Sequence, residues 1–359
     1  MIPLVKPYIP PREALLPALE AVLYSGYIAE GEQVYEFERR FGEFTGNKNV
    51  LALSSGTAAL HIALLLSGVG PGDKVISTPL TAEPTNIAIA QTGAQVVWAD
   101  VEPDTGLPCP RSVRDLTDER TKAIMLVHYA GMVCDMDAFH ALSKETGIPI
   151  IEDAAHALGA KYTGGDVSPY TIYSFQAIKH MTTVDGGALA LGSGTDTQAA
   201  RRLRWFGLDK KVPRLENDIE RAGYKYNMNN CTAAIGLCQL DFIPAVLDRH
   251  IANGKYYDKA LRNIPGLTLL RYHKNTEPSY WLYTMKVDNR EDFIRAMESR
   301  GVAASPLHLR NDRHSVFAKS KRPLPALDKF YQKFVHIPCG HWIDDTTRET
   351  IVTAIKQGW

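Results

Sequence analysis

Short apolar runs with the character of strands alternate with helix-like stretches from Asn49 to Leu191. Alternation of this kind predicts an α/β fold, in which helices connect and cover the strands of a sheet. The run that begins at Ile148 is apolar throughout, as is typical of a strand buried on both faces. The predicted strands lie near Asn49–Leu53, Lys74–Ser77, Gln95–Ala99, Lys122–Val127, Ile148–Ile151, Thr171–Phe175 and Ala188–Leu191.

The chain of 359 residues is longer than a usual single domain, so we expect one large and one small domain. A long helix-like pattern around Asn230–His250 would lead from a large domain, residues 1–240, into a small α+β domain, residues 241–359. Within the small domain, Tyr280–Val287 is predicted to be a strand and Arg290–Arg300 a helix.

Charge and cysteine content exclude several classes of protein. The 40 basic and 40 acidic residues cancel, so there is no electrostatic footprint for nucleic acid or an anionic membrane. The five cysteines are odd in number and form no Cys-x-x-Cys pair, which argues against a disulfide scaffold or a zinc site. No window approaches the length that spans a bilayer, and no signal core follows the amino terminus. We therefore expect a cytoplasmic protein.

Lys179 stands on a short bridge between two predicted strands, Thr171–Phe175 and Ala188–Leu191. A lysine that reacts as a nucleophile and forms a Schiff base needs a pocket that desolvates it and lowers its pKa. Ser174 offers a hydroxyl nearby, and Gly186-Gly187 would let backbone come close to a bound group. In isolation, a lysine is more often a solvated surface charge.

A phosphate-binding site is predicted where the strand ending at Leu53 is followed by the turn Ser54-Ser55-Gly56-Thr57 and then by an apolar helix. Amides at a helix start lack intrahelical partners and point along a favourable dipole, so Ser55, Gly56 and Thr57 could hold a phosphate. The alternative is an ordinary helix cap by Ser54 or Ser55.

The buried run at Ile148 ends in the acid pair Glu152-Asp153, and ligands of open α/β sheets bind at such strand ends. Asp153 could hold a cationic heterocycle nitrogen, or it could cap the next helix. A phosphate seat, a buried carboxylate and a lysine after a strand, in this order, are what pyridoxal phosphate (PLP) requires.

Over nearly its whole length the chain resembles the DegT/DnrJ/StrS family of PLP-dependent sugar-nucleotide aminotransferases. The resemblance implies PLP fold type I, an α/β fold with a mostly parallel seven-stranded sheet in the large domain and a small carboxyl-terminal α+β domain. The matching motifs are SSGTAAL at Ser54–Leu60, EDAAHALGA at Glu152–Ala160, SFQAIK at Ser174–Lys179, GYKYNMNNCTAAIGLCQL at Gly223–Leu240 and PLH at Pro306–His308.

The resemblance also implies a role for each matching residue. Lys179 would form the Schiff base with PLP, and Asp153 would pair with the pyridinium nitrogen. Ala155 would pack against one face of the ring, and His156 would contact the ring hydroxyl. The residues that fall where the family holds the phosphate are Gly56, Thr57 and Ser174.

Partners and substrates follow from the same resemblance. Glutamate would donate the amino group and a keto-sugar nucleotide would accept it, with pyridoxamine phosphate (PMP) between the two half-reactions. The product would be an amino sugar for a surface polysaccharide or a glycosylated metabolite. The candidate substrate-binding residues, each of which could equally be a surface residue, are Tyr27, Glu83, His308 and Arg310.

A homodimer with shared active sites is also expected. In the family, the loop that corresponds to Lys225–Asn229 reaches the cofactor phosphate of the neighbouring subunit. Lys225 and Asn227 stand where many relatives carry Asn and Arg. Lys225 could make the phosphate contact by charge, and a solvated lysine is the alternative.

Three positions depart from the family pattern or add to it. Ala82 stands near the position where many relatives place an aromatic ring that stacks on PLP, and Val184 stands in place of a usual glycine. His180 follows Lys179 directly, and a neighbour on an extended segment is expected to point the other way.

Two other functions remain as alternatives. Some relatives use this scaffold for PLP- or PMP-dependent sugar dehydration or deoxygenation, typically with histidine in place of the lysine or with an iron-sulfur cluster. Lys179 and the absence of a cysteine cluster count against both. A noncatalytic PLP-binding regulatory protein is the other alternative, and the presence of Lys179 and Asp153 disfavours it.

Overall fold

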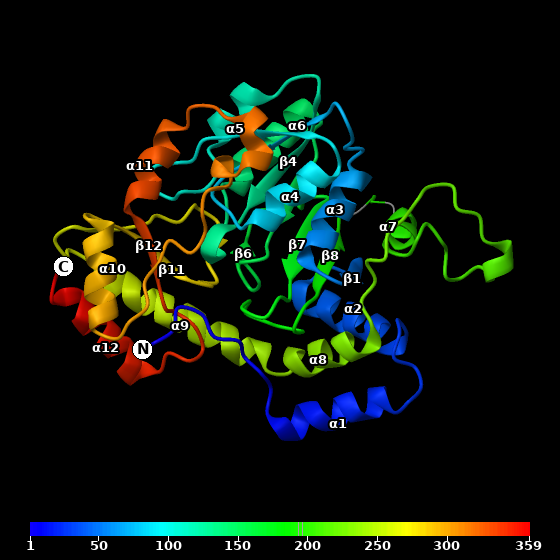
Figure 1. The fold of residues 1–359 in the computed structure, drawn as a ribbon, viewed down its shortest axis with the longest axis horizontal. Coiled ribbons are helices and arrows are strands. Elements are labelled where there is room, and N and C mark those ends of the chain that lie inside the picture. The colour runs from blue at the N-terminus through cyan, green and yellow to red at the C-terminus, as the bar shows by residue number, and fades with distance from the viewer. Residues whose placement is uncertain (193, 196) are drawn as a thin grey trace.

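The computed structural model describes residues 1–192, 194–195 and 197–359. A seven-stranded sheet forms its centre, with the strand order β1-β8-β7-β5-β4-β2-β3 (Figure 1). β8 is antiparallel to β1 and β7, and the other neighbouring pairs are parallel. The mostly parallel seven-stranded sheet is therefore confirmed. Its strands are β1 (Val50–Leu53), β2 (Lys74–Ser77), β3 (Gln95–Trp98), β4 (Thr121–Val127), β5 (Ile150–Asp153), β7 (Tyr170–Ser174) and β8 (Gly187–Leu191).

Helices cover both faces of the sheet. In β1, Leu51 and Leu53 pack into the core on the α3 side, while Val50 and Ala52 pack on the α2 and α8 side. Burial on both faces explains why the strands are continuous apolar runs without alternation. The helices of this part are α1 (Arg12–Leu23), α2 (Glu32–Thr45), α3 (Gly56–Leu66), α4 (Glu83–Gln91), α5 (Pro110–Leu116), α6 (Met136–Thr146) and α7 (Thr197–Arg204).

The carboxyl-terminal part builds a second, smaller core around a three-stranded antiparallel sheet of order β12-β11-β9. Phe317, Leu324 and Phe330 nevertheless pack into the large core, so the boundary at residues 240 and 241 stays a prediction. The remaining elements are α8 (Asn230–Leu240), α9 (Ile243–Ala260), β9 (Leu267–Leu269), β11 (Tyr283–Val287), α10 (Arg290–Ser299), α11 (Pro325–Lys333), β12 (Phe334–Ile337), α12 (Asp345–Lys356), the pair β6 (Lys161–Tyr162) and β10 (Thr276–Glu277), and the short helices η1 (Tyr129–Gly131), η2 (Arg214–Glu216), η3 (Asn311–Arg313) and η4 (Ser315–Ser320).

The helical pattern around Asn230–His250 forms two helices instead of one. α8 ends at Leu240 and α9 begins at Ile243, with a bend of 58° between them. Pro244 lies at the start of α9, where the missing amide hydrogen of proline costs no hydrogen bond. No single helix within the described residues is long and apolar enough to cross a membrane, although this bent pair meets the length and composition test.

Residues 205–229, between α7 and α8, extend well beyond the body of the molecule, and we call them the projecting segment (Figure 1). One isolated bridge, between Trp205 and Lys225, joins the two ends of the segment to each other, and a second, between Leu53 and Asn227, ties the segment to β1. The segment is therefore held at both ends of its root while its tip, around η2, lies away from the sheet.

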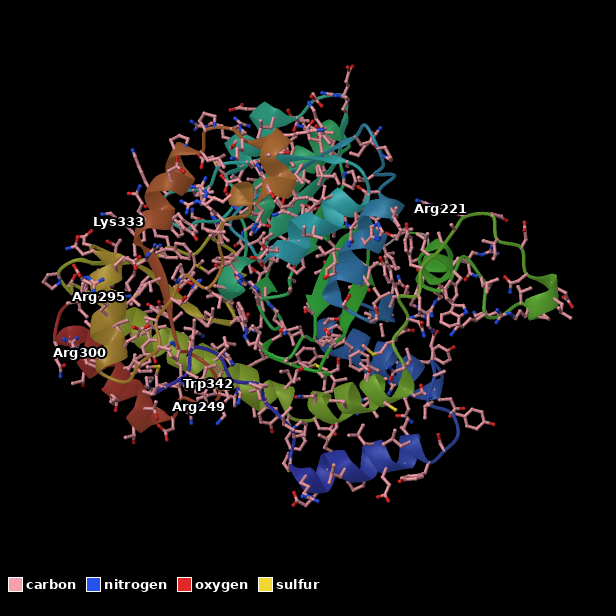
Figure 2. All side chains as sticks on the ribbon, viewed as in Figure 1. Arg221, Arg249, Arg295, Arg300, Lys333 and Trp342 are labelled. Atoms are coloured by element: carbon pink, nitrogen blue, oxygen red, sulfur yellow. The ribbon has the colours of Figure 1, made fainter. Side chains whose placement is uncertain are left out.

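Among the basic side chains labelled in the small domain, Arg249 and Lys333 lie on different helices, whereas Arg295 and Arg300 both lie at α10 (Figure 2). Arg249 on α9 pairs with Asp345, and Lys333 on α11 pairs with Asp288. These cations are paired locally and do not gather into one basic surface. All five cysteines are free.

Candidate active site

A cavity of about 310 Å³ lies where β5 and β7 end and α3 begins. Ligands of open α/β sheets bind at the carboxyl ends of the strands in this way. The predicted site residues that line the cavity are Ser55, Gly56, Thr57, Glu83, Asp153, Ala155, His156, Ser174, Lys179 and His308. The structure therefore brings together residues that lie more than 250 positions apart in the sequence.

Lys179 lies on the turn between β7 and β8, and its amide donates to the carbonyl of Gln176 at 3.0 Å. Burial lowers the pKa of its amine to about 8, and the nearby charge of Asp153 opposes that change. Among the residues that the structure describes, its Nζ forms no ion pair with a carboxylate. A sizeable fraction of the amine is therefore neutral near neutral pH, as a nucleophile requires.

Asp153 ends β5 and is 3% exposed. Its Oδ1 accepts from the amide of Ala155 at 3.1 Å, and its Oδ2 accepts from the Oγ1 of Thr85 at 2.7 Å. Burial raises the pKa of Asp153, whereas these hydrogen bonds and the charge of Lys179 lower it. The two hydrogen bonds fix the carboxylate at the wall of the cavity.

Thr85 is a site residue that sequence reasoning missed. It lies on α4, three residues after Ala82, and its Oγ1 also lies 2.8 Å from the Oγ1 of Thr81. Its contact with Asp153 joins residues 68 positions apart, and no local pattern marks it.

The start of α3 has both features that its sequence indicated. The Oγ of Ser55 accepts from the amide of Ala58 at 3.0 Å and caps the helix. The amides of Gly56 and Thr57 lie in the first turn of α3 and have no intrahelical partner. A Cβ atom on Gly187 would lie 2.4 Å from the carbonyl carbon of Ser55, so β8 approaches this turn as only glycine permits.

These features fit PLP. The free amine of Lys179 suits a covalent bond to its aldehyde, the carboxylate of Asp153 suits a cationic ring nitrogen, and the start of α3 suits its phosphate. A Cβ atom on Gly56 would lie 3.0 Å from the Cβ of Ser174. A residue larger than glycine at position 56 would therefore occupy the space that the phosphate needs.

Histidines near the cavity are neutral. The Nδ1 of His156 accepts from the amide of Ala130 at 3.4 Å, which places the ring proton on Nε2. Burial is the main cause that lowers the pKa of His156 well below its ordinary value and the pKa of His308 to about 4. His180 is buried with its Nε2 3.2 Å from the carbonyl oxygen of Ser279, away from the cavity as expected.

Four predicted site residues lie outside the cavity lining. Tyr27 is 80% exposed. The guanidinium of Arg310 pairs with Asp312 and Asp328, so it already has carboxylate partners within the chain, and its role in substrate binding stays a prediction. The other two are Lys225 and Asn227 on the projecting segment, where the Nζ of Lys225 lies 3.3 Å from the Oδ1 of Asn227.

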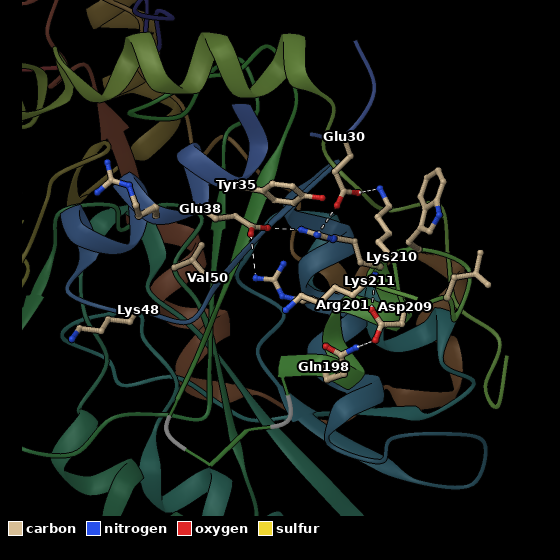
Figure 3. Close-up of a pocket in the computed structure, with 14 residues that line it drawn as sticks. Glu30, Tyr35, Glu38, Lys48, Val50, Gln198, Arg201, Asp209, Lys210 and Lys211 are labelled. Atoms are coloured by element: carbon tan, nitrogen blue, oxygen red, sulfur yellow. Dashed lines mark hydrogen bonds and ion pairs between the residues drawn. The ribbon is translucent and has the colours of Figure 1, made fainter. Parts of the chain in front are cut away.

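A second cavity, of about 420 Å³, lies at the root of the projecting segment (Figure 3). Two of its cations pair with buried carboxylates: Arg204 pairs with Glu30 and with Glu38, and Lys210 pairs with Glu30 at 2.7 Å. We call Glu30, Arg204 and Glu38 the buried ion network. The network joins α7 to α2 and to the segment before α2. The residues of this cavity therefore stabilise the packing of these elements.

Known proteins resemble this chain along its whole length. The spore coat polysaccharide biosynthesis protein SpsC of Bacillus subtilis is 31% identical over 355 residues, covering 93% of this chain and 91% of SpsC. The crystal structure of the sugar aminotransferase CalS13 from Micromonospora echinospora is 34% identical, with a TM-score of 0.96 and complete coverage of both chains. The sugar aminotransferase Spr1654 from Streptococcus pneumoniae in its PMP form is 28% identical, with a TM-score of 0.90, covering 99% of this chain and 97% of that one.

Spr1654 has also been solved in a PLP form. The fold, the cavity and these cofactor states define a PLP-dependent sugar aminotransferase of fold type I. The profile of the DegT/DnrJ/EryC1/StrS aminotransferase family matches residues 11–356, so the chain belongs to that family. The predicted family, fold class, enzyme class and cofactor are thus confirmed.

Proposed function

We propose that the protein transfers an amino group from glutamate to a keto-sugar nucleotide, as a cytoplasmic homodimer. The observation that carries the proposal is the convergence of Lys179, Asp153 and the start of α3 on one cavity. Similarity to proteins named for sugar amination and for polysaccharide biosynthesis supports a product that serves as an amino-sugar precursor.

Different residues of the cavity have different roles in the reaction. When bound, PLP supplies an electron sink that makes the alpha proton of an amino acid removable. The Nζ of Lys179 takes and returns a proton during both half-reactions, and a pKa near 8 suits that exchange. The carboxylate of Asp153 would stabilise a proton on the ring nitrogen of the cofactor. The start of α3, with Ser174 beside it, would hold the phosphate.

The donor and acceptor are tested by absorbance. Glutamate should bleach the visible absorbance of the purified holoenzyme, and a suitable keto-sugar nucleotide should restore it, with the aminated sugar detected by mass spectrometry. A holoenzyme that keeps its absorbance with glutamate but loses it with another amino acid would contradict the donor assignment. Amination of simple keto sugars alone would contradict the nucleotide requirement.

The homodimer is supported by what the single chain leaves exposed. Leu215 at the tip of the projecting segment is fully exposed, and Tyr24 after α1 is 86% exposed. Lys225 and Asn227 lie outside the cavity of their own chain. A second copy that covers these apolar side chains would also receive Lys225 in its own site.

Mixing two inactive variants tests the shared site. Lys179→Ala and the double variant Lys225→Ala, Asn227→Ala should each lose most activity. After dissociation and reassociation of an equal mixture, about a quarter of wild-type activity should return, because about half of the dimers are mixed and each mixed dimer has one intact site out of two. An active monomer at high dilution, or a mixture that stays inactive while mixed dimers form, would contradict the arrangement.

A further inference from the structure

Trp281 contacts three parts of the candidate active site although it does not line the cavity. Its side chain is buried, and its indole Nε1–H donates to the carbonyl of Ile178 at 2.8 Å. The ring of His156 stacks on the indole with centroids 4.0 Å apart and planes at 22°. The Nζ of Lys179 lies 4.2 Å from the indole centroid.

The backbone that carries Trp281 is fixed between the two parts of the molecule. Trp281 precedes β11 of the small domain, and next to it the amide of Ser279 donates to the carbonyl of Gly131 at 3.0 Å. Gly131 has a φ of 95°, and a Cβ there would lie 2.8 Å from the amide nitrogen of Trp281. This close approach, which only glycine allows, holds the indole against the large domain.

The indole face meets a cation that has no carboxylate partner. Within the described part of the chain, the Nζ of Lys179 forms no ion pair, and an unpaired cation inside a protein is unfavourable. The negative face of an indole attracts an ammonium group at this distance. The indole face is therefore in direct contact with the Lys179 amine, while the charge of Asp153 acts on the amine without pairing with it.

We propose that Trp281 is a positioning residue for the transamination. The face of its indole holds the amine of Lys179 whenever that amine is not joined to the cofactor, and its N–H fixes the backbone carbonyl just before the lysine. The inference deepens the assignment of Lys179 as the residue that binds PLP, and it rests on that assignment.

A purely apolar role for Trp281 predicts a different result. If the indole only excludes water, leucine can replace it, and the pKa of Lys179 stays the same or moves up as water enters. If the indole face stabilises the ammonium form, leucine removes that stabilisation and the pKa moves down. The direction of the change decides between the two roles.

The test measures the cofactor-free protein and needs no turnover. Pyridoxal 5′-phosphate is mixed with apoprotein over a pH series, and the rate of imine formation is followed by stopped-flow absorbance. In the wild type the rate should rise with pH with an inflection near pH 8. In Trp281→Leu the inflection should fall by roughly one unit, and in Trp281→Phe by less, because phenylalanine keeps a weaker aromatic face.

Trp359→Leu is the matched control, since Trp359 packs against Phe293 in the small domain; its inflection should equal that of the wild type. An unchanged or raised inflection in folded Trp281→Leu overturns the proposal. If that variant does not fold, judged by circular dichroism, an inflection in Trp281→Phe at or above the wild-type value overturns it. Imine formation that survives in Lys179→Ala would instead show that the assignment of Lys179 fails.

Discussion

Lys179 and Arg204 are two cationic side chains inside the same part of the molecule, and their surroundings are opposite. Arg204 is 3% exposed and pairs with both Glu30 and Glu38. Lys179 faces the cofactor cavity and, among the described residues, pairs with no carboxylate, so burial lowers its pKa to about 8. Arg204, which stabilises the fold, has its charge balanced by two carboxylates. Lys179, which reacts, has no such partner and can lose its proton more easily.

The largest effect is expected at Asp153, whose charge acts on Lys179 without pairing with it. Asp153→Asn should keep the hydrogen bond from the Ala155 amide and reverse the one with Thr85, but it removes the charge that would stabilise the ring proton, and turnover should fall by about 10²–10³-fold. Steady-state kinetics with saturating cofactor measure this. Glu152→Gln is the control, because Glu152 pairs with His128 instead of lining the cavity. Near-normal turnover in Asp153→Asn would show that its electrostatic role is wrong.

The next effect tests the compensated cation. Arg204→Met leaves Glu30 and Glu38 buried without the cation they share, with only Lys210 and Arg201 at the edge of the network as partners, and the free energy of unfolding should fall by about 3–5 kcal/mol. Urea denaturation measures the loss. Arg39→Met is the control, since Arg39 pairs with Glu36 and Glu43 on the exposed face of α2, and it should change stability little. Wild-type stability in Arg204→Met would contradict the claim that the ion pairs of Arg204 stabilise the fold.

The same substitution at Lys179 should have the opposite sign. Lys179→Met removes a cation without a carboxylate partner, so the cofactor-free protein should gain about 3 kcal/mol near neutral pH. Because the folded pKa of about 8 lies below the ordinary 10.5, the unfolded chain binds more protons between these values. Wild-type stability therefore rises with pH through that window.

The advantage of Lys179→Met should accordingly be largest below pH 8 and disappear above pH 10.5. Urea denaturation of the apoprotein over a pH series measures it. An advantage that does not change with pH would mean that packing, and not the buried charge, is responsible.

The smallest effect is expected at Val184, next to the cavity residue Asp185. Val184 has a φ of 73° and is 65% exposed, so a β-branched residue is strained there while burying little. Val184→Gly should therefore stabilise the protein by about 1 kcal/mol. Thermal unfolding measures it, and Val167→Gly, at an exposed valine without a positive φ, should destabilise it. A lower melting temperature for Val184→Gly would contradict the claim that the backbone at Val184 is strained.

Much of the fold was predictable because the signal is local. The run Lys74–Ser77 coincides with β2, and each predicted strand of the large domain overlaps an observed one. β5 extends to Asp153 instead of ending at Ile151. The acidic side chains suggested that the strand had ended, yet their backbone still pairs with β4. Side-chain polarity therefore placed the end too early where a strand enters a polar cavity.

The candidate site was predictable only in part, because local patterns mark the ends of strands but not the contacts between distant segments. Lys179, Asp153 and the start of α3 each follow a strand, and strand ends meet at one edge of the sheet. Trp281 reaches the site through a hydrogen bond that joins residues 103 positions apart, which no local pattern encodes. The Arg310 guanidinium was equally unpredictable, because its engagement by Asp328 depends on how α11 packs.

The central claim is that the amine of Lys179 is the one that holds PLP. Borohydride reduction of the holoenzyme, followed by proteolysis and mass spectrometry, tests it most directly. The phosphopyridoxyl group should lie on the peptide that contains SFQAIK and on no other peptide at comparable yield. A label on another lysine, with Lys179 unmodified at full cofactor occupancy, would contradict it.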